Sequence, residues 1–161
     1  MKTLLLSAAF AALSAVSAFA EGVVAIEPFA FATAKTAKAG GAYVSLMNHG
    51  PADRLIGAES DVARRVEVHE HIKDGDVMRM RHVEGGLELP EGGMIEMKPG
   101  GYHVMLMGLH APLEAGQSFP VTLVFESGAE VTVDVPIRKR GAHGDGHSTG
   151  HSHSGHSSSS D

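Results

Sequence analysis

The stretch VEVHEHIKDGDVMRMR, residues 66–81, decides the fold because apolar and polar side chains alternate along it before a turn signal. Such alternation is typical of a β-strand with one face against a core. Since successive side chains of a strand point to opposite faces, Val66 and Val68 are expected to face the core. His69 and His71 then lie together on the other face. The stretch therefore predicts a half-buried strand that carries imidazoles on its outer side.

The same stretch also predicts a hairpin. Lys73 to Asp76 contain the turn residues Asp-Gly-Asp, and ten residues separate His69 from Met80. A turn at this point reverses the chain, so the side chains of His69 and Met80 come together.

A second stretch, GGYHVMLMG at residues 100–108, has the same alternation, and it places His103, Met105 and Met107 on one face. A histidine and a methionine two residues apart can reach a single ion. Thioether sulfur is a soft donor, and imidazole suits copper and zinc. The chain has eight methionines and no cysteine. Imidazole and thioether without thiolate indicate Cu(I) rather than zinc, iron or calcium.

The rest of the chain between residues 21 and 140 predicts further short strands in one domain. Val131 to Val135 alternate, and Phe119 to Phe125 are rich in β-branched residues. Turn signals recur about every ten residues, and no segment has a helical period over three turns. The pattern predicts an all-β protein, either a sandwich or a barrel.

Residues 1–20 predict a cleaved secretory signal peptide. Lys2 is followed by an apolar run, and Ala18-Phe19-Ala20 forms a small-x-small cleavage site. The alternative is a membrane anchor, but the run is short for a span and no basic cluster follows it. Cleavage leaves about 140 residues, within the size of one domain and with no stable membrane insertion expected.

Composition narrows the functional class. The net charge of −6 gives no electrostatic reason to bind nucleic acid or an anionic membrane. Without cysteine the protein cannot form a disulfide, and it cannot form a blue-copper electron-transfer site, which needs a thiolate. No Ser-His-Asp, paired-carboxylate or phosphate-loop motif stands out, so we expect a protein that is not an enzyme.

Residues 141–161 differ sharply from the domain before them. GAHGDGHSTGHSHSGHSSSSD contains histidines among Gly, Ser and Asp and no large apolar residue, which predicts a disordered tail. Four of its imidazoles are nitrogen donors suited to Cu(II), Zn or Ni, namely His147, His151, His153 and His156. The alternatives are a purification tag and a passive linker.

The spacing of the candidate ligands resembles that of the periplasmic copper chaperones of the PCuAC type, whose pattern is His-x10-Met-x21-His-x-Met. Here His69, ten residues, Met80, twenty-two residues and His103-Val104-Met105 reproduce it with one extra residue. Gly85-Gly86 is a turn that tolerates such an insertion. The similarity covers about residues 22–137. Its flanking matches include Ala42-Tyr43, Asp53-Arg54-Leu55, Pro99-Gly100-Gly101-Tyr102-His103 and Met107-Gly108-Leu109.

The resemblance implies a cupredoxin-like Greek-key β-sandwich in the periplasm, with Cu(I) bound by His69, Met80, His103 and Met105. It also implies delivery of copper to the CuA site of cytochrome c oxidase, through the CuA subunit or an assembly factor. From the residues alone, Met78 and Met107 remain alternatives to the two named methionines. We expect the site to be exposed near the end of the sandwich, because Cu(I) with neutral ligands keeps a charge that disfavours burial.

Other functions remain open. The receiver could be another copper enzyme or a resistance system. A buffering protein would bind copper or zinc mainly through its tail, and an adhesion or assembly module would bind no stoichiometric Cu(I).

Overall fold

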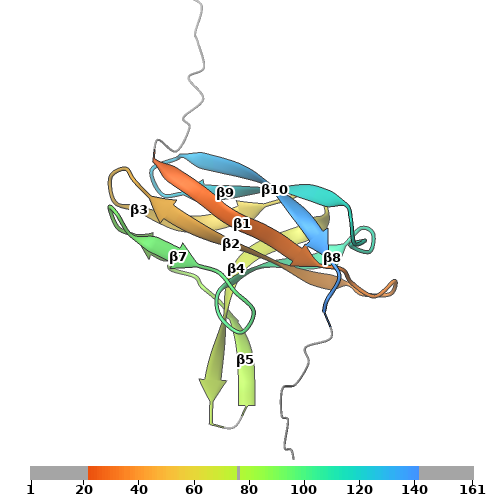
Figure 1. Ribbon diagram of the computed structural model, residues 1–161. Coiled ribbons are helices and arrows are strands. Elements are labelled where there is room, and N and C mark those ends of the chain that lie inside the picture. Colours follow the sequence, from red (N-terminus) through yellow and green to blue (C-terminus); the bar gives the residue numbers. More distant parts are fainter. Residues whose placement is uncertain (1–21, 76, 142–161) are drawn as a thin grey trace, which may run out of the picture.

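Ten β-strands make up most of the chain that the computed structural model describes, which is residues 22–75 and 77–141 (Figure 1). The strands are β1 (Val23–Phe31), β2 (Ala39–Asn48), β3 (Asp53–Glu59), β4 (Ala63–Asp74), β5 (Val77–His82), β6 (Leu87–Leu89), β7 (Met94–Glu96), β8 (His103–Leu109), β9 (Ser118–Phe125) and β10 (Glu130–Arg138). These ranges contain no α-helix. Within them, no helix is long and apolar enough to cross a membrane. The predicted signal peptide and residues 142–161 of the tail lie outside the described residues.

The strands follow the order β5-β4-β8-β2-β1-β10-β9-β3-β6, and β7 pairs with β2. The order folds into two layers, with β5, β4, β8, β2 and β1 in one and β10, β9, β3 and β6 in the other (Figure 1). The layers meet where β1 and β10 run parallel over two residue pairs, Ala30 with Ile137 and Phe31 with Arg138. The other strand pairs are antiparallel. The prediction of an all-β sandwich is confirmed.

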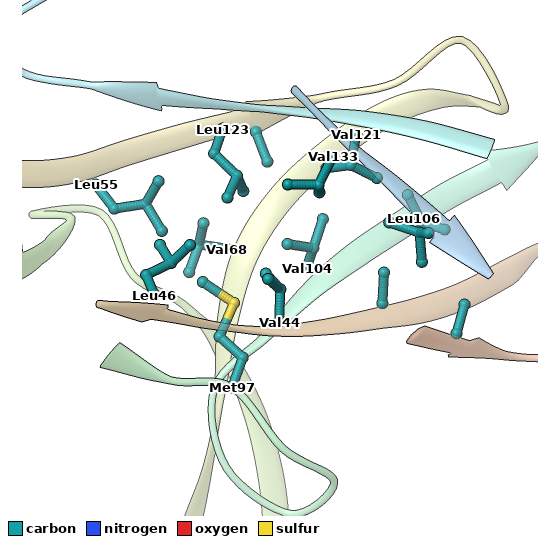
Figure 2. Packing of buried hydrophobic residues seen from close by; sticks show 14 of the residues in the cluster. Val44, Leu46, Leu55, Val68, Met97, Val104, Leu106, Val121, Leu123 and Val133 are labelled. Atoms are coloured by element: carbon teal, nitrogen blue, oxygen red, sulfur yellow. The ribbon is translucent and has the colours of Figure 1, made fainter. Parts of the chain in front are cut away.

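The hydrophobic core lies between the two layers (Figure 2). Leu46 of β2 and Leu106 of β8 face it from one layer, and Leu55 of β3 and Leu123 of β9 from the other; all four are 0% exposed. Fully burying one such side chain stabilises the fold by about 1.5–3 kcal/mol. Since the chain has no cysteine, this packing stabilises the fold without disulfides.

The hairpin formed by β4 and β5 projects beyond the sandwich (Figure 1). β5 is an edge strand that pairs only with β4, and its described side chains are exposed throughout. Two ion pairs join its strands, Glu70 with Arg81 at 2.6 Å and Asp74 with Arg79 at 3.0 Å. The hairpin is thus held by its own cross-strand contacts rather than by the core.

The turn of this hairpin is shorter than the sequence predicted. Asp74 pairs directly with Val77, so Lys73 and Asp74 belong to the strand and only two residues connect β4 to β5. Gly75 has a φ of +63°, which two-residue hairpin loops need and glycine adopts without strain. The shorter turn shifts the expected register by two residues, so Met80 lies opposite His71 instead of His69.

Candidate metal centre

Three histidines form one row across neighbouring strands. His69 of β4 lies opposite His82 of β5 on one side and opposite His103 of β8 on the other. Directly opposed residues of antiparallel strands share a face of the sheet. The ring centroid of His69 is 5.7 Å from that of His82 and 6.0 Å from that of His103. The register therefore brings together imidazoles that are far apart in the sequence.

The rows on either side of the histidines add the thioethers. His71 lies opposite Met80, and Glu67 lies opposite Met105. The ring centroids of His71 and His103 are 4.8 Å apart. We call this surface of β5, β4 and β8 the histidine face. It carries all four residues that the sequence predicted as ligands, His69, Met80, His103 and Met105.

The histidine face is the outer face of its layer. Val68, between Glu67 and His69 on β4, is 3% exposed, and its partner Val104 on β8 is 0% exposed. Both point into the core (Figure 2). Because side chains alternate, their neighbours His69 and His103 point away from the core.

The four predicted residues differ widely in exposure, which corrects the expectation of an exposed site. Met80 on the projecting hairpin is 53% exposed, whereas His103 is only 2% exposed. The side chain of His69 is intermediate, at 14%. His103 is covered because its neighbours are large rings, with Tyr43 of β2 at 6.2 Å between centroids and His71 at 4.8 Å. The site thus runs from a buried imidazole to an exposed thioether.

His103 is held in one orientation by the backbone. Its Nδ1 lies 3.1 Å from the carbonyl oxygen of Gly101, which can only accept, so Nδ1 carries the hydrogen and Nε2 keeps its lone pair. Burial lowers the pKa of His103 below its ordinary value of 6.5; the hydrogen bond to Gly101 opposes this shift, and the nearby His71 and His69 add to it. The lowered pKa favours the neutral ring, and the hydrogen bond to Gly101 leaves Nε2 as its free nitrogen; a neutral imidazole with a free nitrogen is the form that binds metal.

His69 is held by a side chain instead. Its Nε2 lies 2.8 Å from Oε2 of Glu67. The hydrogen bond from His69 is the main cause that lowers the pKa of Glu67; partial desolvation opposes it, and the charge of Arg65 adds to it. The other ring nitrogen, Nδ1, is buried and has no hydrogen-bond partner in the described part of the chain.

The structure also distinguishes the two alternative methionines, Met78 and Met107, from the two predicted ligands. Met107 lies opposite Arg65, whose Nη2 donates to its sulfur at 3.4 Å. Met78 lies opposite Lys73, towards the hairpin tip. Met80 and Met105 are next to the histidine row in register, so they are better placed than Met78 and Met107.

Sequence reasoning missed two members of the cluster. His82 stands in neither of the two stretches that predict the site, and it is exposed, but the register places it opposite His69. His71 was placed on the correct face and given no role. The alternation of His69, His71 and the following hairpin could have indicated both, had the turn length been known.

The chemistry of the face is mixed. Among residues 22–75 and 77–141, no three His, Asp or Glu side chains already surround one ion position. The donors that do gather combine imidazole with thioether, a set that suits soft copper better than a hard cation.

Comparison with known proteins places this chain in a family. Residues 23–137 match the family described as LpqE-like, a group of putative lipoproteins. This chain belongs to the LpqE-like family. The match extends over all ten strands apart from the last residue of β10.

Two curated relatives of this LpqE-like chain cover part of it. It is 40% identical over 84 residues to the putative lipoprotein Lxx21020 of Leifsonia xyli subsp. xyli, a match that covers 52% of this chain and 51% of that protein. It is 28% identical over 96 residues to the uncharacterized protein RP573 of Rickettsia prowazekii, covering 59% and 53%. The chain therefore spans about half the length of the curated relatives it matches.

Solved structures resemble the LpqE-like chain over most of their length. The copper-bound PCuAC domain from PmoF2 has a TM-score of 0.60 at 27% identity, covering 73% of this chain and 93% of that domain. The Cu(I) form of DR1885 from Deinococcus radiodurans has a TM-score of 0.58 at 26% identity, covering 81% and 84%. The resemblance to PCuAC-type proteins and the cupredoxin-like fold are confirmed.

Proposed function

We propose that this protein is a non-catalytic copper chaperone that binds one Cu(I) through His69, Met80, His103 and Met105. The observation that carries the proposal is the histidine face, where imidazole and thioether donors from three neighbouring strands lie together in a chain without cysteine. The copper-bound structures that the fold resembles support it.

The gradient of exposure suits a carrier. A chaperone must hold its ion and still release it to a partner. His103 is anchored and shielded, while Met80 is exposed on a hairpin outside the core. An incoming ligand from a receiving protein can replace Met80 first and the inner donors afterwards. Because all four donors are neutral, no charged ligand must be separated from the ion at any step.

The compartment, the receiver and the tail complete the proposal. The description of the family as putative lipoproteins supports a location outside the cytoplasm, which we propose to be the periplasm after cleavage of residues 1–20. We propose the CuA site of cytochrome c oxidase as the destination of the copper. The tail residues His147, His151, His153 and His156 form a second site for an ion such as Cu(II).

Anaerobic Cu(I) titration tests the proposed site. The mature protein is expected to bind one Cu(I), and Met80→Leu and His103→Ala each to weaken binding at least tenfold, or about 1.4 kcal/mol. Met94→Leu is the matched control, because Met94 on β7 is 54% exposed and lies outside the histidine face. An absence of stoichiometric Cu(I), or an equal loss in Met94→Leu, would refute the assignment.

Removing residues 141–161 distinguishes the chaperone from a buffering protein. The shortened protein is expected to keep its Cu(I) site, since the four ligands lie in β4, β5 and β8. A buffer that depends on its tail would lose nearly all binding.

Copper transfer to an isolated apo CuA domain tests the destination. The loaded protein is mixed with that domain, and the absorption of the CuA centre is measured after oxidation. Failure of transfer to the CuA domain would favour another copper enzyme or a resistance system.

A further inference from the structure

The contact between Glu67 and His69 determines the tautomer of the imidazole. The two residues lie two positions apart on β4, on the same face, with Oε2 of Glu67 at 2.8 Å from Nε2 of His69. An ionised carboxylate can only accept a hydrogen bond, so Nε2 must be the donor. A neutral imidazole carries a single hydrogen on its two nitrogens. Nδ1 of His69 therefore keeps a free lone pair.

The free lone pair is in an unusual position. Nδ1 of His69 is buried and has no hydrogen-bond partner within the described residues. Buried acceptors in folded proteins are nearly always satisfied, so one without a partner needs an explanation. An ion bound on the histidine face would provide the missing partner without any change in the contact to Glu67.

His103 presents the opposite nitrogen. Its Nδ1 donates to the carbonyl of Gly101, which leaves Nε2 free. The two imidazoles of the row are thus fixed by different groups, one by the backbone and one by a carboxylate. Substitution can remove the carboxylate of Glu67 but not the backbone carbonyl of Gly101.

Glu67 is itself held in place. Its Oε1 accepts a contact from Nε of Arg65 at 3.4 Å, and its side chain is 23% exposed. It lies opposite Met105 in the register, at the edge of the proposed ligand set. The carboxylate is therefore close to the ion position while both of its oxygens have other partners.

We infer that Glu67 is a positioning residue that holds His69 through Nε2–H, so that His69 binds the ion through Nδ1 while His103 binds it through Nε2. The inference rests on the proposed function, because it takes His69 as a ligand. A carboxylate on the far nitrogen fixes the ring and raises the basicity of the coordinating nitrogen.

Long-range ¹H–¹⁵N NMR of the histidine rings in the full chain tests the nitrogen assignment, since Cu(I) is diamagnetic. In the copper-free protein His69 is expected as the Nε2–H tautomer. On addition of Cu(I), the Nδ1 signal of His69 should shift while Nε2 stays protonated. A Cu(I)-dependent shift of Nε2 with loss of its proton overturns this inference and leaves the proposed function intact. If neither nitrogen responds, His69 is not a ligand and both proposals fail.

Two substitutions at position 67 separate positioning from a structural role. Glu67→Gln keeps an oxygen that accepts from Nε2, so the tautomer and the Cu(I) affinity should be retained to within about threefold. Glu67→Ala releases the ring, and the affinity should fall about 10- to 100-fold, as is usual for partners of metal-bound histidines. The tautomer signal should become mixed.

Glu130→Ala is the control for charge. Glu130 is exposed at the start of β10, in the other layer of the sandwich. The substitution removes the same charge away from the β4–β5 hairpin and should leave both the His69 signals and the affinity unchanged. An equal loss in Glu130→Ala and Glu67→Ala, or an unchanged His69 tautomer in Glu67→Ala, would overturn the positioning role.

Discussion

At the scale of single residues, His103 combines a titratable side chain with almost complete burial. Water is replaced around it by the rings of Tyr43 and His71 and by the carbonyl of Gly101. Burial disfavours the charged form of a histidine. The same surroundings that keep the ring ready for metal therefore make its protonation costly for the folded protein.

This burial predicts a pH dependence of stability in the copper-free protein. Because the folded pKa of His103 lies below its ordinary value of 6.5, the unfolded chain takes up a proton near that pH that the folded chain does not. This contribution is fully present above about pH 6.5 and is lost as the pH falls below it. We expect the free energy of unfolding, measured with urea, to fall less between pH 7.5 and pH 5.5 for His103→Gln than for the wild type. His110→Gln, at an exposed position directly after β8, is the control; the same loss in all three proteins would contradict this interpretation.

At the scale of elements, the last residue of β2, Asn48, is hydrogen-bonded to the connection that follows β6. Asn48 is 1% exposed, and its Nδ2 donates to the carbonyls of Pro51, Leu89 and Pro90 at 2.7, 3.2 and 3.3 Å. Its Oδ1 accepts from the amide of Gly50. One amide side chain thus satisfies backbone groups from two connections at that end of the sandwich.

Replacing this amide is expected to be costly. Asn48→Ala removes one buried and three part-buried hydrogen bonds, so the free energy of unfolding should fall by about 2–3 kcal/mol. Gln117→Ala removes an exposed amide and should change it by less than about 0.5 kcal/mol. Denaturant titration of both variants measures the difference, and equal effects would show that the Asn48 contacts are not decisive.

The β4–β5 hairpin is expected to be the least protected part of the histidine face. β5 has one neighbour, whereas β8 is paired on both sides. In hydrogen exchange, amides of β5 should exchange faster than those of β8, and Cu(I) should slow β5 if Met80 binds the ion. Protection of β5 that is unchanged by one equivalent of Cu(I) would argue against Met80 as a ligand.

At the scale of the whole molecule, the core and the histidine face occupy opposite sides of one layer. This arrangement predicts that stability and copper binding can be changed separately. Leu123→Ala, in the far layer, should lower the free energy of unfolding by about 2–5 kcal/mol without changing Cu(I) affinity below the unfolding temperature. Met80→Leu should weaken Cu(I) binding without changing the free energy of unfolding. Thermal unfolding and Cu(I) titration of the two variants test this, and loss of affinity in Leu123→Ala would mean that the site depends on the core.

Much of this organisation could be predicted from sequence, because strand alternation is a local property. The valines at 66 and 68 correctly indicated which side of β4 faces the core. The register of the hairpin could not be predicted, since it depends on whether Gly75 adopts a positive φ in a two-residue loop. The burial of His103 was missed for a related reason, because its cover comes from residues brought together by pairing. The role of His82 as a neighbour of His69 depends on the same pairing.

The short parallel contact between β1 and β10 fixes how far the end of β10 lies from His69. Ile137 stands in a continuous row of paired residues, through Ala30, Ala42 and Val104, that ends at Val68 beside His69. Four interstrand spacings separate the ends of this row, or roughly 19 Å. The nine residues that follow Arg138, up to His147, have a fully extended length of roughly 30 Å. This sequence length is enough for the proposed tail imidazoles to reach the proposed copper ligands. Under the proposed function, an ion passed from the tail to those ligands would meet them at an effective concentration of about millimolar.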